Sequence, residues 1–506
     1  MLDRASARAL LAIDRMGIQP LCYAHPAPGV LVFGSTTDSV EAHPAVGANV
    51  RLQALYDFLY FIDRIPAPDT VYEEQSKLPP GHYLLFEKGE VQLKPYWRMP
   101  YAADRARRKD ELAADLLRHL RAALAGSLDG ENFDKVGAFL SGGLDSSTIL
   151  GLLAEAGPRP KSFTIGFGVE GFDEVPYAKV AANHFESVHH VYYVGPADVV
   201  AAIPKVAEIY DEPFANSSAI PAYYCALHAK EAGVDVLLAG DGGDELFAGN
   251  SRYRDDAVFD HYGLIPEALR KGVIEPLLNG VPGLNRIPVV RKLCRYVSLA
   301  KRPVAERLTC NNIYSSRSPE AIFTEEALSA MSLGAPAALA DEIYEETASE
   351  AKLHRMMHLD LRITLADSDL RKVSRMCELA GLRVRFPFLN DAIVEFSATI
   401  PPELLLEGGR LRGFYKEALG DFLPPEILAK KKKGFGLPYL DLVRTYEPLN
   451  QLVCDSLQSL KKRRYFRGAF LDSATDWLHA GGLHGLGDIK KGVVWDLMML
   501  EMWFES

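Results

Sequence analysis

A short turn between a strand and a helix, carrying two adjacent glycines, constrains this chain more than any other feature. The apolar stretch Val136–Leu140 predicts a buried strand, the residues SGGLDSS follow at positions 141–147, and a helical pattern runs from Thr148 to Ala156. Gly142 and Gly143 let the backbone approach an anion closely, while serine hydroxyls and the first amides of the helix supply donors. A tight turn without a ligand is the alternative, but the whole heptad between a strand and a helix favours a phosphate-binding loop.

A second loop of the same kind follows about a hundred residues later. Val234–Ala239 predicts another buried strand, and GDGGDELFAG occupies positions 240–249 directly after it. From Val136 onward, predicted strands and helices alternate. This order predicts an α/β fold with a doubly wound parallel sheet and ligand-binding loops at the carboxyl ends of its strands.

Together these motifs resemble a known family. The form SGGxDS resembles the N-type ATP pyrophosphatases, which cleave ATP between its α and β phosphates. With the second loop at this spacing, the chain resembles the glutamine-dependent asparagine synthetases of the class II amidotransferase type. Further segments match that family in the same order, namely Phe163–Phe167, Asp173-Glu174, Asp211–Pro213, Ser217-Ser218, Pro221, Arg375-Met376, Val384–Leu389, Ile427-Leu428, Lys432, Gly434-Phe435 and Pro438.

The resemblance implies a set of site residues and two small ligands, ATP and Mg²⁺. Asp145 and Asp244 are expected to bind Mg²⁺, because hard carboxylate oxygens suit that ion. The expected pyrophosphate-binding residues are Ser141, Gly142, Gly143, Ser146 and Ser147, and the expected adenosine contacts are Leu140, Ile165 and Gly240.

Three further residues are expected to take part in catalysis. Asp241 would accept the proton of the attacking amine, and Asp369 would support it, although Asp367 competes for that position and a helix cap is an equal alternative. Lys432 would neutralise charge on the departing pyrophosphate. A solvated basic face is the alternative for Lys430–Lys433.

The implied reaction adenylates a carboxylate, the β-carboxylate of L-aspartate in the family, and passes ammonia to it to give asparagine and AMP. Several residues depart from the family pattern and leave the acid open: Asn250, Ser374, Cys377-Glu378, Arg383 and Asn390. Relatives with the same domain close β-lactam or lasso-peptide rings, so a cyclase is the alternative within the ligase class. An ATP-binding protein without turnover is the alternative from another class.

The first hundred residues are expected to form a β-rich, partial glutaminase-like domain. Strands are predicted at Leu10–Ile13, Gly29–Phe33 and His82–Phe86, with one helix at Leu52–Phe61. We divide the chain into residues 1–98, a solvated linker at 99–110, and a synthetase domain at 111–506 with a helical insertion from about 255 to 355.

The family's glutaminase begins with Cys after the initiator Met, whereas Leu2 stands here and Cys22 lacks a terminal amine. Glutamine hydrolysis is therefore not expected. The stretch Leu11–Leu21 resembles a segment well inside that domain, so roughly the domain's first half is expected to be missing. Either the start of the chain was lost or wrongly assigned, or the enzyme takes ammonia or another amine directly. Unpaired strand edges in such a partial domain would call for a homodimer or a partner chain to cover them.

Composition limits the expected partners and cellular compartment. The 506 residues carry a net charge of −11 without basic blocks, which argues against nucleic acid as a partner and leaves a small-molecule acid and an amine. The six cysteines are scattered without CxxC spacing, as in reduced cytoplasmic proteins. No apolar stretch approaches the roughly 20 residues of a membrane span.

Overall fold

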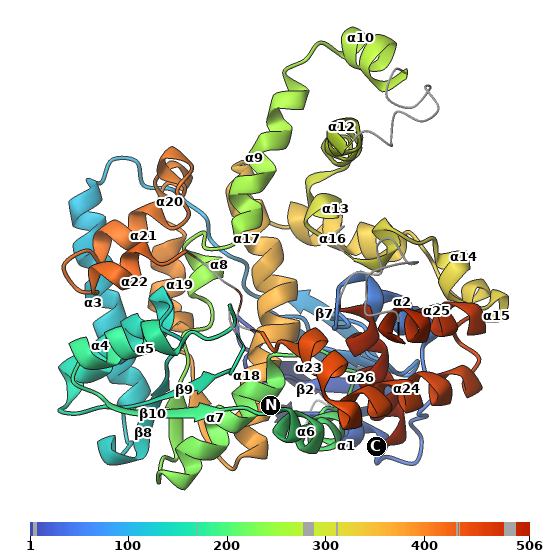
Figure 1. Cartoon of the computed structure of the whole chain (residues 1–506), viewed down its shortest axis with the longest axis horizontal. Helices are drawn as coiled ribbons and strands as arrows, with labels where there is room; N and C mark the ends of the chain where they lie inside the picture. The colour runs from blue at the N-terminus through green and yellow to red at the C-terminus, as the bar shows by residue number, and fades with distance from the viewer. Residues whose placement is uncertain are drawn as a thin grey trace.

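A computed structural model describes residues 1–3, 8–169, 171–276, 288–309, 312–431, 434, 436–479 and 492–506. Within them the chain forms one parallel sheet, two small antiparallel sheets and many helices (Figure 1). The predicted mixed α/β fold with a parallel sheet is confirmed.

The parallel sheet has five strands in the order β10-β9-β8-β11-β12. Their bounds are Val188–Tyr193 for β10, Lys161–Gly166 for β9, Val136–Phe139 for β8, Val236–Leu238 for β11 and Arg383–Arg385 for β12. The chain builds outward from β8 in one direction and then returns to build outward from β11 in the other. The loops after β8 and β11 therefore lie side by side at the point where the strand order reverses, which is where open α/β sheets bind ligands.

Helices pack against this sheet on two sides. On one side, α4 (Leu144–Ala156) contacts β8, α5 (Val175–His184) contacts β9 and β10, and α3 (Lys109–Leu128) packs on α4. On the other side, α7 (Ala219–Glu231) contacts β9 and β10 and packs against α18 (Leu370–Leu379), which contacts β12 (Figure 1). The inner strands β8, β9 and β11 are largely buried, as expected for a sheet covered on both faces, whereas the edge strands β10 and β12 are partly exposed.

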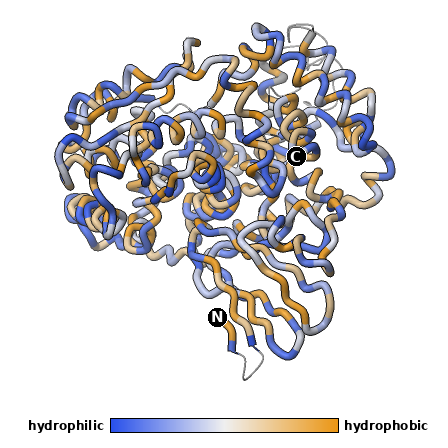
Figure 2. The backbone as a smooth tube through the Cα atoms, turned by 90° about the horizontal axis from the view of Figure 1, so that it is seen from below, coloured by the Kyte–Doolittle hydropathy of each residue, from blue (hydrophilic) through white to orange (hydrophobic). Residues whose placement is uncertain are grey.

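The first hundred residues form two antiparallel sheets. One sheet holds β1 (Leu2–Asp3), β2 (Arg8–Ala12), β6 (His82–Glu87) and β7 (Glu90–Pro95), and the other holds β4 (Val30–Gly34), β3 (Cys22–Ala27) and β5 (Gln75–Lys77). A small cluster of Leu11, Ile13, Leu78 and Leu84 is buried here. Two helices, α1 (Thr37–Glu41) and α2 (Leu52–Tyr60), complete the region, and the strands beside the N-terminus project from the rest of the chain (Figure 2).

The segment at residues 99–110, expected to be a solvated linker, contacts the larger region. Tyr101 is half-buried and its ring stacks on His354 with 4.3 Å between centroids, and Lys109 and Asp110 already belong to α3. The backbone amides of Ala102 and Asp104 donate to carbonyls of residues 398 and 399. The Tyr101 ring and these two backbone hydrogen bonds therefore attach the segment to the larger region.

The helical insertion starts directly after the second loop. Its first helix, α9 (Ser251–Gly263), projects from the rest of the chain together with α10 and α12 (Figure 1). The helices that follow are α10 (Glu267–Leu269), α12 (Pro288–Ala300), α13 (Val304–Thr309), α14 (Pro319–Ile322), α15 (Glu325–Ser329), α16 (Ala335–Glu345) and α17 (Lys352–Leu359). A π-helix at Asp360–Asp369, η5, then leads into α18.

The last third of the chain is helical. Short helices around the parallel sheet are α19 (Asp391–Ser397), α20 (Pro402–Leu405), α21 (Gly413–Ala418) and α22 (Pro425–Ala429). The C-terminal helices are α23 (Tyr439–Thr445), α24 (Glu447–Lys462), α25 (Gly468–His479) and α26 (Val493–Glu505). Both α24 and α26 pack on α6 (Pro196–Ile209).

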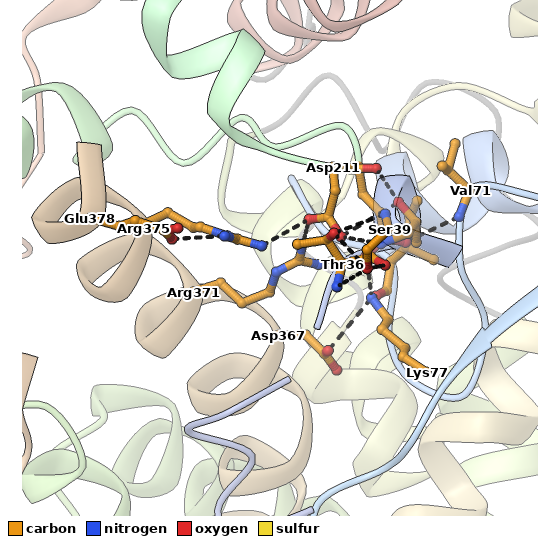
Figure 3. A network of polar contacts seen from close by, with 12 residues as sticks. Thr36, Ser39, Val71, Lys77, Asp211, Asp367, Arg371, Arg375 and Glu378 are labelled. Carbon is orange, nitrogen blue, oxygen red and sulfur yellow. Dashed lines mark hydrogen bonds and ion pairs between the residues drawn. The ribbon is translucent and has the colours of Figure 1, made fainter. Parts of the chain in front are cut away.

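Buried charges join the N-terminal sheets to the larger region (Figure 3). The Lys77 ammonium on β5 donates to Glu212 Oε2 at 2.8 Å and lies 3.7 Å from Asp367 Oδ1. Arg371 on α18 donates to Glu212 and, at 2.7 Å, to Asp211. We call Lys77, Asp211, Glu212, Asp367, Arg371 and Arg375 the interface network.

None of the helices among the described residues combines the length and the apolar character needed to span a bilayer.

Candidate functional site

A cavity of about 1180 Å³ opens at the carboxyl ends of β8 and β11. Its walls come from the two glycine-rich loops, from η5 and α18, and from residues 410–417 and 427–434. Ten of the residues expected from the sequence line it: Leu140, Ser141, Gly143, Asp145, Ser146, Ile165, Gly240, Asp241, Asp244 and Asp369. Segments far apart in the sequence therefore meet at the predicted place.

The first loop is held in shape by its own serines. Ser141 Oγ and Ser146 Oγ lie 3.0 Å apart, the Ser141 amide donates to Ser146 Oγ, and the Gly143 amide donates to Ser141 Oγ at 3.2 Å. Gly142 has a φ of +65°, and a Cβ there would lie 2.4 Å from the Ala178 amide nitrogen. Only glycine fits that position, so the loop lies tightly against the start of α5.

The second loop packs directly against the first. A Cβ on Gly243 would lie 2.2 Å from Asp145 Oδ1, and one on Gly240 would lie 3.0 Å from the Asp145 Cβ. Gly242 has a φ of +95° and precedes the single turn of α8 (Gly243–Leu246), which carries Asp244. The absence of side chains at positions 240 and 243 brings the carboxylates of Asp145 and Asp244 into the same corner of the cavity.

Arg412, which was not among the expected site residues, bridges these two carboxylates. Arg412 Nη1 donates to Asp145 Oδ2 at 2.6 Å and to Asp244 Oδ1 at 3.1 Å, and Nη2 donates to the other Asp145 oxygen and to the Gly243 carbonyl. The side chain is 4% exposed, and its guanidinium stacks on the Tyr415 ring at 4.2 Å. The two carboxylates hold the pKa of Arg412 above its ordinary value, against the effect of burial.

The carboxylate pair suits a magnesium ion that is bound together with phosphates. Mg²⁺ takes one or two protein carboxylates and completes its octahedron with substrate phosphate oxygens and water. Asp145 and Asp244 lie close enough to share one guanidinium, so they supply such a pair. In the described part of the chain, no group of three or more His, Cys, Asp or Glu side chains is arranged to hold a metal without a ligand's help.

Asp241, Asp369 and Lys372 form a further group of charged side chains lining the cavity. Lys372 on α18 is half-buried and donates to Asp369 Oδ1 at 2.7 Å. Burial raises the pKa of Asp241 to about 6, with Lys372 opposing and Asp369 assisting the shift. The neighbouring Asp367 instead accepts the Ala67 amide at 3.1 Å and belongs to the interface network. Of these two acids in η5, only Asp369 lines the cavity.

Two of the expected residues are placed otherwise, and a third is outside the described part of the chain. Gly142 and Ser147 are not among the residues lining the cavity, and Ser147 Oγ is buried within α4 without a hydrogen bond to any described residue. Lys432 lies outside the described residues. Its neighbour Lys430, which the sequence also allowed to be a solvated residue, is 9% exposed and donates to Glu174 at 2.7 Å and to the Ser141 carbonyl at 3.2 Å.

Two adjacent histidines on β10, His189 and His190, are held by contacts with β9. His189 lies 2.8 Å from Thr164 Oγ1, and His190 stacks on Phe163 at 4.9 Å between centroids. Both side chains are accounted for by their contacts on β9 and β10, as adjacent residues on a strand predict.

The fold and cavity define a nucleotide-binding type of α/β protein, with phosphate-loop geometry at the switch point of a parallel sheet. Comparison with known families identifies it further. Residues 115–505 match the asparagine synthase family and residues 1–97 match the glutamine amidotransferase domain. Because the first match covers most of the chain, this protein belongs to the asparagine synthase family.

Individual relatives are distant. The chain is 26% identical over 437 residues to asparagine synthetase [glutamine-hydrolyzing] 1 of Bacillus subtilis, covering 84% of this chain and 65% of that protein. It is 22% identical to asparagine synthetase [glutamine-hydrolyzing] 3 of the same organism, over 84% of this chain and 64% of that protein. It is 25% identical to amidase chyE of Penicillium rubens, over 84% of this chain and 67% of that protein. The chain thus spans about two thirds of the length of these relatives.

Proposed function

We propose that this chain is an ATP-dependent ligase that forms an amide bond. ATP would react with a carboxylate to give an acyl-adenylate and pyrophosphate, and an amine would then displace AMP. The observation that carries the proposal is the meeting of the two glycine-rich loops and of Asp145 with Asp244 in one cavity at the switch point of the sheet. The family relationship supports the same chemistry.

In this proposal the loop after β8 binds pyrophosphate. Ser141, Ser146 and the amides that open α4 supply donors and the positive end of the helix dipole, and Lys430 adds a cation beside the loop. Mg²⁺ held by Asp145 and Asp244 would neutralise charge on the departing phosphates. Leu140, Ile165 and Gly240 line the part of the cavity that we assign to adenosine.

Asp241, Asp369 and Lys372 would act on the attacking amine. Asp241 has a pKa of about 6, so it is ionised at neutral pH and can accept the proton that the amine loses as it attacks the acyl carbon. Lys372 and Asp369 lie beside it, and their ion pair fixes the local charge. We assign Asp241 the role of base and Asp369 the role of a positioning residue. We keep Lys432 as the residue that meets the departing pyrophosphate.

We take L-aspartate as the acid and ammonia as the amine, which gives asparagine and AMP. No glutaminase activity is assigned to Cys22, because its thiol is 2% exposed and burial next to Asp211 and Glu212 raises its pKa. A larger acid or an internal amine is the second candidate. The cavity exceeds the roughly 300–1,000 Å³ of ordinary ligand pockets, so it has room for a bulkier acid beside ATP.

The test is a measurement of AMP and pyrophosphate formed from Mg-ATP with L-aspartate, with ammonium or glutamine as nitrogen source and asparagine followed by mass spectrometry. Asparagine that depends on ammonium would support the proposal. AMP formation only with other acids would favour the second candidate. No AMP with any acid, while ATP still binds, would refute a ligase and favour a binding protein.

A further inference from the structure

Arg412 occupies the position between the two carboxylates to which the proposed function assigns Mg²⁺. Its four hydrogen bonds go to Asp145, to Asp244 and to the Gly243 carbonyl, all within the corner where the two loops meet. A guanidinium and a metal ion compete for these same carboxylate oxygens. The structure therefore raises the question of what happens to Arg412 when metal and nucleotide bind.

The backbone conformation of Arg412 and its contact with Tyr415 fix its position. Its φ of +59° lies in the left-handed region, which a side chain of this size rarely adopts, so the surrounding contacts must compensate for the strain. The Arg412 Cζ lies 4.2 Å from the centroid of the Tyr415 ring, and the Tyr415 hydroxyl donates to Thr148 Oγ1 on α4 at 3.0 Å. The arginine is thus held against the helix that begins at the first loop.

The guanidinium has one donor to spare. Arg412 Nε is buried and makes no hydrogen bond to any described residue, although the side chain lines the cavity. A buried donor without a partner is destabilising unless a ligand satisfies it. A phosphate is the fitting partner, because a guanidinium matches phosphate oxygens with two parallel hydrogen bonds.

We propose that Arg412 is an exchangeable counter-ion: it neutralises Asp145 and Asp244 until Mg²⁺ takes over these carboxylates, and it then binds the pyrophosphate portion of the nucleotide. The inference rests on the proposed function, because it uses the same metal site. Without the exchange, two neighbouring half-buried carboxylates would repel each other before the metal arrives. With it, positive charge stays in the corner at every stage.

Two binding measurements separate this role from that of a structural brace. In Arg412→Met, Mn²⁺ alone, measured by the loss of its free electron paramagnetic resonance signal, should bind about tenfold more tightly, because the competing cation is gone. Pyrophosphate in the presence of Mg²⁺, measured calorimetrically, should bind roughly 10- to 100-fold more weakly, because a charge-assisted contact is lost. A brace would weaken both, since its loss would disorder the loops.

The matched control is Arg121→Met, which removes an exposed arginine paired through two hydrogen bonds with Glu155 and should change neither affinity. If Arg412→Met does not fold, Arg412→Gln keeps a donor for Asp145 without the charge and should give the same two signs. Weaker or unchanged Mn²⁺ binding in the folded variant would overturn the inference.

Asp145→Asn distinguishes this failure from failure of the proposed function. If Asp145→Asn leaves both Mn²⁺ and Mg-pyrophosphate binding unchanged, the metal site itself is misassigned and the proposed function fails with the inference. The other outcome is that Asp145→Asn weakens the binding of both Mn²⁺ and Mg-pyrophosphate. If Arg412→Met then fails to tighten Mn²⁺ binding and weaken Mg-pyrophosphate binding, only the role of Arg412 is refuted.

Discussion

Replacing Lys77 by Met should destabilise the chain through the interface network. The Lys77 side chain is 5% exposed, and its ammonium donates to Glu212 Oε2 at 2.8 Å and to the Ile65 carbonyl at 2.6 Å (Figure 3). The network contains three cations and three carboxylates, so the variant leaves three carboxylates with only two cations.

Removing one member of a buried ion pair costs about 3–5 kcal/mol. We expect a value near the lower end, about 3 kcal/mol, because Arg371 still donates to Glu212 and the Val71 amide still donates to its other oxygen. Since about 1.4 kcal/mol corresponds to a factor of ten, opening of the interface should become on the order of 100-fold more frequent.

Limited proteolysis under native conditions measures this opening when reclosing is faster than cleavage, and urea unfolding gives an independent midpoint. The double variant Lys77→Met with Glu212→Gln removes both charges and should recover most of the loss. Lys230→Met, which removes an ammonium 3.0 Å from the exposed Asp235, is the matched control and should cleave like the unaltered chain. A Lys77→Met loss below about 1 kcal/mol, or a double variant no better than the single one, would refute the reasoning.

Three further changes test other parts of the molecule. Asp241→Asn should lower the rate of amide formation by roughly 100- to 10,000-fold. In the unaltered chain, kcat/KM should rise with pH through about 6 as Asp241 ionises. A flat profile from pH 5 to 8 would exclude Asp241 as the base. Gly243→Ala places a methyl group 2.2 Å from Asp145 Oδ1, so calorimetry should show Mg-pyrophosphate affinity reduced about tenfold, and unchanged affinity would contradict the close approach of the two loops. Burial raises the pKa of Asp57 to about 7, so the folded chain retains a proton that the unfolded chain releases above about pH 4, and stability falls as pH rises from about 4 to 7. The free energy of unfolding of Asp57→Asn, measured by thermal unfolding, should therefore equal that of the unaltered chain at pH 4 and exceed it by on the order of 2 kcal/mol at pH 8. The Gln53 amide can still donate to Asn in the variant. Equal stability at pH 8 would contradict the raised pKa.

The sheet and its two loops could be predicted because their signals are local. Gly142, Gly143 and Asp145 lie within four residues of one another directly after an apolar strand, and parallel strands bring their carboxyl ends to one edge. The same reasoning placed Asp241 and Asp244. It failed for Ser147 because a loop motif does not specify which hydroxyl faces the cavity once the helix has begun.

Arg412 could not be predicted because its partners are remote. It lies 267 residues from Asp145 and 168 from Asp244, in a glycine-rich segment without helical or strand periodicity. Nothing in that segment distinguishes an arginine that will be buried from the exposed Arg410 two positions earlier. The interface network was missed for the same reason, since Lys77 and Glu212 are 135 residues apart.

The segment formed by η5 and α18 connects the two places where buried charge is concentrated. Asp367 and Arg371, four residues apart, bind partners in the interface network, whereas Asp369 and Lys372 pair with each other at the wall of the cavity. Residues three or four apart share one face of a helix, so one rigid element presents its two charged faces to two different neighbours. Because a packed helix moves as a body, the contacts of the N-terminal sheets with Asp367 and Arg371 also set the position of Asp369 and Lys372 beside Asp241. The N-terminal region thereby contributes to the geometry of the cavity without supplying a residue to it among those described.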